Sequence, residues 1–177
     1  MARIPPIEID QAEPAVRALY EQLRLTLGIE PNNFFKTLAH QPALLSPMID
    51  LTGALLEGGS LSRRLKEWVI LHVAFSHGSP YVFDAHLRAL SRLVRPACAG
   101  SVLRPDEAEK LAIRYASEVM KGGATAGTFA KLRARFDEAA IVELTLLVGF
   151  YGMVCRLVET LETPIDPLRF IAPQASA

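Results

Sequence analysis

Apolar residues recur at intervals of three and four along most of the chain, the period of amphipathic α-helices. The first such run carries Val16, Leu19, Tyr20, Leu23 and Leu27. No series of runs with alternating apolar and polar residues predicts a β-sheet. We expect seven or eight helices in an all-α fold, at about residues 14–27, 33–35, 42–57, 62–76, 80–93, 105–121, 125–136 and 137–161.

Proline, glycine and serine mark the ends of these runs. Proline fits the first helical turn, because its missing N–H has no partner there anyway, so Pro14 predicts a helix start. Ser79-Pro80 combines a capping side chain with such a proline. Gly28 can close the first helix in the left-handed conformation. Residues 95–104 are expected to form a loop, and the proline-rich C-terminal tail is expected to cross the surface.

Composition narrows the functional classes. A chain of 177 residues, half of them hydrophobic, predicts one packed domain. The counts of acidic and basic residues are equal, which gives no indication of nucleic-acid binding and little resistance to self-association. Cys98 and Cys155 lie far apart and predict neither a disulfide framework nor a zinc site. Both are expected to be small buried hydrophobic residues.

The chain gives no sequence signal for secretion or membrane insertion. Residues 1–6 lack the apolar region of a signal peptide. The most apolar segment, between Glu143 and Arg156, is shorter than the roughly 20 residues of a membrane span. We therefore expect a cytoplasmic protein without a membrane partner. Gly149 and Gly152 within this segment suggest a close approach between helices, for example at a subunit contact.

The segment from Ser62 to Leu90, SRRLKEWVILHVAFSHGSPYVFDAHLRAL, resembles the AhpD-like (carboxymuconolactone decarboxylase-like) family. That family has a glutamate on one helix, a Cys-x-x-Cys motif after a break, and a histidine four residues later. Glu67 stands at the position of the glutamate and His86 at that of the histidine. Ser79 and Val82 stand where the two cysteines would be, and Tyr81 falls where the family often has histidine or tyrosine.

The resemblance extends over nearly the whole chain. Residues 1–61 look like the family's N-terminal helical extension, and residues 141–166 look like its closing helix. The resemblance implies a single AhpD-like domain spanning residues 1–177 and a bundle of helices. It also implies a small-molecule substrate and a homo-oligomer, whether a dimer, a trimer or a hexamer.

The departure from the motif bears directly on the chemistry. In thiol members the start of the helix lowers the pKa of a cysteine, and the glutamate and histidine exchange protons with it. Ser79 has no redox chemistry and Val82 has no nucleophile. Cys98 lies about a dozen residues beyond His86 and does not replace them. Thiol hydroperoxidase activity is therefore not expected.

His86 and Glu67 are the leading catalytic candidates. A histidine can carry a proton near neutral pH, and Glu67 can orient it across a helical hairpin. The alternatives are a histidine that merely packs on a helix face and a glutamate that pairs with Arg63 or Arg64. An apolar setting for Glu67 would raise its pKa.

Ser79 and Tyr81 complete the candidate site. Ser79 is better placed to cap a helix than to act as a nucleophile, because about 10 Å along the helix axis separates it from His86. A proton relay through Tyr81 or through a water molecule is the remaining way to join them. His72 and His77 do not have the spacing of a metal site, so neither a metal nor a cofactor is expected.

Three functions remain open. The first is an enzyme without redox thiols that decarboxylates, isomerises or dehydrates a small oxygenated, carboxylated compound, with Arg63, Arg64 or Arg88 holding the carboxylate. The second is a residual alkylhydroperoxidase or peroxiredoxin-type activity that uses Cys98 or Cys155. The third is a non-catalytic oligomeric scaffold or ligand-binding protein.

Overall fold

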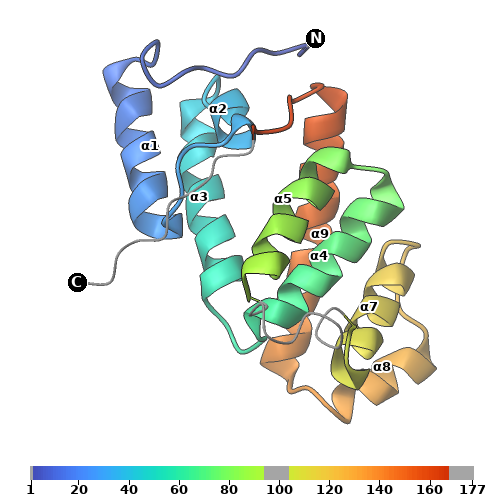
Figure 1. Ribbon diagram of the computed structural model, residues 1–177. Helices are drawn as coiled ribbons and strands as arrows, with labels where there is room; N and C mark the ends of the chain where they lie inside the picture. Colours follow the sequence, from blue (N-terminus) through green and yellow to red (C-terminus); the bar gives the residue numbers. More distant parts are fainter. Residues whose placement is uncertain (1, 94–103, 168–177) are drawn as a thin grey trace.

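A computed structural model describes residues 2–93 and 104–167, and these ranges contain eight helices and no strand (Figure 1). The all-α prediction is confirmed. Most of the loop predicted at residues 95–104, Cys98 and the last ten residues lie outside the described residues. The helices are α1 (Pro14–Leu27), α2 (Asn33–Leu38), α3 (Pro42–Glu57), α4 (Arg63–His77), α5 (Pro80–Leu93), α7 (Glu107–Val119), α8 (Ala126–Arg133) and α9 (Glu138–Thr160).

Most predicted helix ends are confirmed, because they depend on local chemistry. Gly28 and Gly78 both have φ of 64° and end α1 and α4 in the left-handed conformation. The start of α7 differs by two residues from the prediction at Pro105. Asp106 is the N-cap there, since its side chain accepts a hydrogen bond from Glu109 N. The Glu109 side chain in turn accepts a hydrogen bond from Asp106 N, which completes a capping box.

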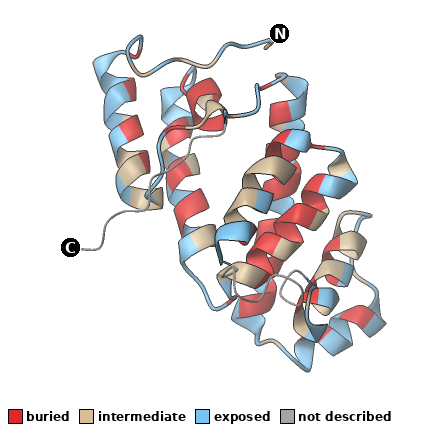
Figure 2. Ribbon diagram, in the orientation of Figure 1, coloured by how far each residue is buried: buried red, intermediate tan, exposed pale blue. Residues whose placement is uncertain are grey.

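Helix α4 is the centre of the bundle, with α5, α7 and α9 packed around it, while α1 packs against α3 on the other side of the molecule (Figure 1). The buried residues of α4 and α9 face each other across the core (Figure 2). Gly78 lets the chain reverse between α4 and α5, so these helices form a hairpin. The hairpin places positions 67 and 86 on neighbouring helices.

Helix α9 is the longest helix of the described chain and is strongly apolar. By length and composition it is the one helix among residues 2–93 and 104–167 that could cross a membrane. In the fold, however, 56% of its most apolar 18-residue window is buried inside the molecule. This degree of burial is typical of a core helix, although part of the apolar surface of α9 remains exposed.

Candidate functional site

The structure pairs Glu67 with His86 across the α4–α5 hairpin. Glu67 Oε2 lies 2.7 Å from His86 Nδ1, which is the distance of a strong hydrogen bond. The Glu67 side chain is completely buried, whereas the His86 side chain keeps 14% of its surface exposed. Two of the four predicted site residues therefore come together, as their positions in the motif implied. Their catalytic role stays a prediction.

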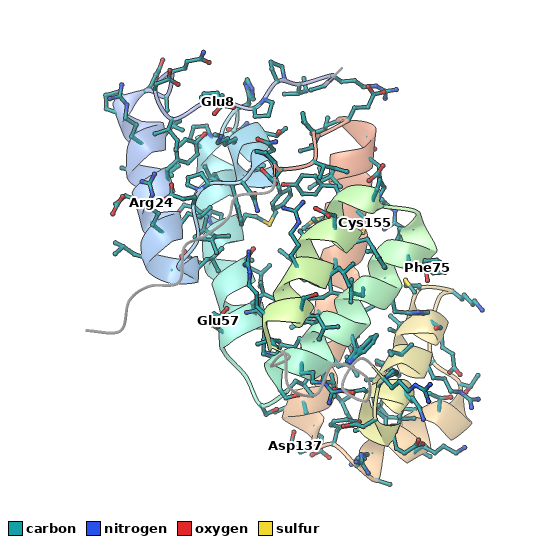
Figure 3. The ribbon with its side chains drawn as sticks, in the orientation of Figure 1. Glu8, Arg24, Glu57, Phe75, Asp137 and Cys155 are labelled. Carbon is teal, nitrogen blue, oxygen red and sulfur yellow. The ribbon has the colours of Figure 1, made fainter. Side chains whose placement is uncertain are left out.

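Arg63 holds the second oxygen of the Glu67 carboxylate. Arg63 Nε donates to Glu67 Oε1 at 2.7 Å, one helical turn earlier on α4. The same guanidinium also pairs with Glu57 at the C-terminal end of α3, which is labelled in Figure 3. Burial alone would raise the pKa of Glu67, but hydrogen bonds and charges from His86 and Arg63 together lower its pKa. The carboxylate is thus ionised at neutral pH, contrary to the raised pKa expected from its apolar sequence surroundings.

This arrangement fixes the orientation of the His86 ring. Because the ionised carboxylate of Glu67 only accepts hydrogen bonds, Nδ1 of His86 carries the proton and Nε2 of the neutral ring has a free lone pair. Within residues 2–93 and 104–167, no hydrogen bond is made to Nε2. The ring therefore has a buried carboxylate on its Nδ1 side, the arrangement that the histidine of a Ser-His-Asp triad also has.

Tyr151 of α9 is a site residue that sequence reasoning missed. Its ring meets the His86 ring edge-to-face, with centroids 4.8 Å apart and an angle of 88° between the planes. Burial and the nearby charge of Glu67 raise the pKa of Tyr151, so its hydroxyl stays protonated. No sequence signal predicts this contact, because no motif links α9 to position 86.

Ser79 lies at the other end of α5 and serves as a helix cap, as predicted. Its hydroxyl oxygen is 3.5 Å from Val82 N and donates a hydrogen bond to Glu159 Oε1 at 2.7 Å. Ser79 and Val82 are each 2% exposed. In the described parts of the chain no hydrogen bond connects Ser79 with Glu67 or His86. The positions of the family's two cysteines are thus filled by a buried cap and a core valine.

Cys155 of α9 lies beside Ser79, near the start of α5 (Figure 3). The spacing of the cysteines along the chain does not predict this proximity. Burial raises the pKa of the Cys155 thiol to about 11, despite the opposing effect of the contact with Ser79, and the residue is 1% exposed. Such a thiol is protonated at neutral pH and out of reach of solvent, so it lacks the properties of a reactive cysteine.

Tyr81 has a different place from the predicted relay. Its hydroxyl donates to Asp166 Oδ2 at 2.6 Å and accepts a hydrogen bond from Phe34 N at 2.9 Å. It therefore joins α5 to the start of α2 and to the segment after α9. Burial and Asp166 raise the pKa of Tyr81, which keeps the hydroxyl protonated. The described residues show no hydrogen bond from Tyr81 to Ser79 or His86.

The arginines considered for a substrate carboxylate are all paired with protein groups. Besides Arg63, Arg64 lies 3.2 Å from Glu109 and also donates to the backbone of Arg104. Arg88 pairs with Asp84 and donates to the backbone of Asp166. None of the three is positioned as a ready clamp for an anionic substrate.

No metal-binding cluster of three or more His, Cys, Asp or Glu residues occurs in the part of the chain that the structure describes. His72 Nε2 lies 2.5 Å from Ser117 Oγ on α7, and His77 lies beside Gly152 on α9. The two histidines therefore belong to separate helix contacts.

Two surface depressions lie away from the Glu67–His86 pair. One, of about 640 Å³, is lined by residues at the starts of α4, α7 and α9. The other, of about 370 Å³, lies on the C-terminal half of α9. Neither is lined by Glu67 or His86.

No protein-family model matches the sequence, and no curated protein matches it either. Solved structures do match the fold. The debrominase Bmp8 with 2,3,4-tribromopyrrole superposes with a TM-score of 0.76 at 17% identity, covering 92% of this chain and 91% of that one.

Two bacterial proteins are similar to the same degree. A peroxidase-related protein from Silicibacter sp. TM1040 has a TM-score of 0.75 at 19% identity, over 92% of both chains. An alkylhydroperoxidase AhpD core protein, also peroxidase-related, from Ralstonia eutropha JMP134 has a TM-score of 0.75 at 21% identity, over 93% of this chain and 92% of that one. The predicted AhpD-like fold is thereby confirmed.

Proposed function

We propose that this chain with the AhpD-like fold is an acid–base enzyme in which His86 Nε2 moves a proton to or from a small molecule. The observation that supports this function is the buried, ionised Glu67 bonded to His86 Nδ1 at 2.7 Å. A buried carboxylate in this position selects the tautomer and stabilises the imidazolium that forms when Nε2 takes up a proton. Arg63 keeps the carboxylate in place by binding its second oxygen.

The proposed step is proton transfer at a carbon next to a carbonyl group. His86 Nε2 removes the proton, the electron pair moves into the carbonyl to form an enolate, and the imidazolium returns the proton at the same or another atom. Decarboxylation, isomerisation and dehydration all require this equipment, so the site does not choose among them. Fold does not select the reaction either, since solved proteins of this fold include a debrominase and peroxidase-related proteins.

Because the arginines already pair with protein groups, a substrate carboxylate held by an arginine is less favoured than the sequence alone indicates. A substrate carboxylate at Arg63 would have to displace Glu57 and lie next to the Glu67 carboxylate, whose like charge opposes it. We therefore favour a small oxygenated compound held by apolar contacts over one anchored by an arginine.

A non-catalytic role is the second candidate, and one observation favours it. Val82 fills its motif position as a core residue, and neither of the two depressions reaches His86. On this alternative the Glu67–His86 pair stabilises the hairpin only. The thiol alternative has less support, because the described cysteine, Cys155, is buried with a raised pKa.

Proton–deuterium exchange in D₂O, followed by NMR, tests the proposal on a panel of small ketones and lactones, with levulinate and its methyl ester as a matched charged and neutral pair. We expect the wild type to accelerate exchange, more for the neutral ester. His86→Ala should lower the rate by about 10²–10⁴-fold. His40→Ala, at an exposed histidine bonded to Pro5 O, is the control and should leave the rate unchanged.

Two readouts on the same variants separate the alternatives. Hydroperoxide turnover that disappears in Cys155→Ser or Cys98→Ser, but not in His86→Ala, would support the thiol function. An equal exchange rate in wild type and His86→Ala, or no exchange of any compound by the wild type, would contradict the acid–base proposal and leave the non-catalytic role.

A further inference from the structure

Helix α9 exposes a stripe of apolar residues on the side that faces away from the core. The exposed fractions are 59% for Val142, 55% for Leu146 and 38% for Met153, and Gly149 between them is also exposed. Charged residues are absent from the sequence between Glu143 and Arg156. A helix that is apolar on all sides is normally buried on all sides, so this face lacks its cover in the isolated chain.

The spacing of the stripe matches the contact face of one helix against another. Its residues follow each other at intervals of four, three and four, the a/d pattern of side-by-side helices. They lie on one side of α9 and extend over about 16 Å. A second helix running along α9 therefore fits this surface better than a small ligand does.

The sizes of the side chains favour one direction for that second helix. If a second α9 runs antiparallel, Leu146 faces the partner's Gly149 and Val142 faces the partner's Met153. Gly149 offers room for a large side chain, because no atom lies within 4 Å of the place where its Cβ would be. This open space beside Gly149 forms a notch in the stripe. A parallel helix would set Gly149 against the partner's Gly149 and leave the notch empty.

The charges at the ends of the stripe favour the same direction. In the antiparallel register Arg156, which is exposed, lies next to the partner's Glu138, whose side chain is 77% exposed in the single chain. A parallel register would instead bring the two arginines together. The apolar depression of about 370 Å³, lined by Met153, Arg156, Leu157, Thr160 and Leu161, continues the stripe toward its C-terminal end.

From these features we propose that the face formed by Val142, Leu146, Gly149 and Met153 is the contact surface for a second copy of this chain, packed antiparallel on a two-fold axis. Each copy supplies the same large and small positions, so the surface is complementary to itself, as a two-fold contact requires. The inference goes beyond the proposed function, because it involves neither Glu67 nor His86.

Light scattering coupled to size exclusion tests the contact at about 1–100 µM, the range in which a specific dimer of ordinary affinity forms. We expect a dimer for the wild type, and a dissociation constant raised at least about 100-fold by Leu146→Glu or Gly149→Leu, since one buries a charge and the other fills the notch. Leu25→Glu, at an apolar residue of α1 that is 80% exposed, is the matched control and should remain dimeric.

Folding of the variants is checked by circular dichroism and thermal unfolding. Gly149→Leu improves the helix propensity of α9, so a monomeric variant should keep its fold. A wild type that is monomeric throughout this range overturns the proposal. Equally, a dimer that survives both Leu146→Glu and Gly149→Leu shows that another face makes the contact.

Cysteine cross-linking tests the direction of the helices in a Cys98→Ser background. A chain with Val142→Cys and Met153→Cys together should form a disulfide-linked dimer, because these positions face each other across the antiparallel contact. Either substitution alone should cross-link at least about tenfold less under the same oxidation, since a disulfide requires closely spaced Cα atoms. Strong cross-linking by Met153→Cys alone indicates parallel helices and overturns the proposed arrangement.

Discussion

Two positions of the motif on α5, Ser79 and His86, have opposite properties, although only two helical turns separate them. At one end, His86 has an ionised buried partner, and among the described residues no hydrogen bond is made to its Nε2. At the other end, Ser79 is 2% exposed and its hydroxyl is engaged by Val82 and Glu159. Burial beside a charged partner holds the His86 ring in one orientation, whereas burial of Ser79 and Cys155 keeps both side chains away from solvent.

The largest loss of stability is expected when the buried Glu67–His86 pair is broken. Glu67→Ala leaves Arg63 half-buried with only Glu57 as its carboxylate partner, and leaves Nδ1 of His86 without an acceptor. Removing one partner of a buried ion pair costs about 3–5 kcal/mol of the free energy of unfolding. Urea unfolding measures this loss.

Glu107→Ala is the matched control for this change, because Glu107 pairs with Lys110 at the surface with 82% of its side chain exposed. It should cost no more than about 1 kcal/mol. Similar losses for Glu67→Ala and Glu107→Ala would mean that the buried pair does not stabilise the hairpin.

A somewhat smaller effect is expected from protonation of Glu67, which makes the free energy of unfolding depend on pH. The pKa of Glu67 is lowered in the fold from its ordinary 4.5, so the ionised form stabilises the native state above that pH. This stabilisation is lost as the pH falls from about 4.5 through the lower folded value, where the carboxylate becomes protonated. Wild-type stability should therefore decrease on acidification through this range.

Glu67→Gln shows which part of that decrease comes from Glu67. The variant cannot ionise at this position, so its stability should fall less steeply with pH, by at most one proton or about 1.4 kcal/mol per pH unit. Urea unfolding at several pH values between about pH 6 and pH 3 gives both curves. Curves of equal slope would show that the pKa of Glu67 is not lowered in the fold.

Most of the helices can be predicted from the sequence because they depend on local signals, such as Gly28, Gly78 and Ser62 at helix ends. The Glu67–His86 pair is implied by the resemblance to the AhpD-like motif, and the hairpin brings the two positions together. The start of α7 differs from its prediction because the capping box that begins at Asp106, and not Pro105, sets the first turn.

Contacts between segments that lie far apart in the chain cannot be predicted from the sequence alone. Tyr151 and Cys155 reach the motif from α9, and their orientation is not fixed by its sequence, because α9 is apolar on all sides. Tyr81 was placed near His86 by its motif position, but its hydroxyl bonds Asp166, 85 residues away. Only the packed structure shows such partners.

The smallest expected change in stability concerns Ser79, at the opposite end of α5 from His86. Ser79→Ala removes a helix cap, which costs about 1 kcal/mol, and also the hydrogen bond to Glu159, which adds about 0.5–1.5 kcal/mol. Ser62→Ala removes only a cap, since Ser62 Oγ accepts from Leu65 N at 3.2 Å at the start of α4. The difference between the two variants, measured by urea unfolding, gives the contribution of the contact with Glu159.

Proton exchange by Ser79→Ala then tests whether the ends act independently. Because the hydroxyl of Ser79 bonds neither Glu67 nor His86, the exchange rate of the folded variant should equal that of the wild type. A loss of exchange comparable to that of His86→Ala would mean that Ser79 takes part in the reaction, and the two ends would then form one site. An unchanged rate with reduced stability means that α5 keeps its acid–base function at the His86 end alone.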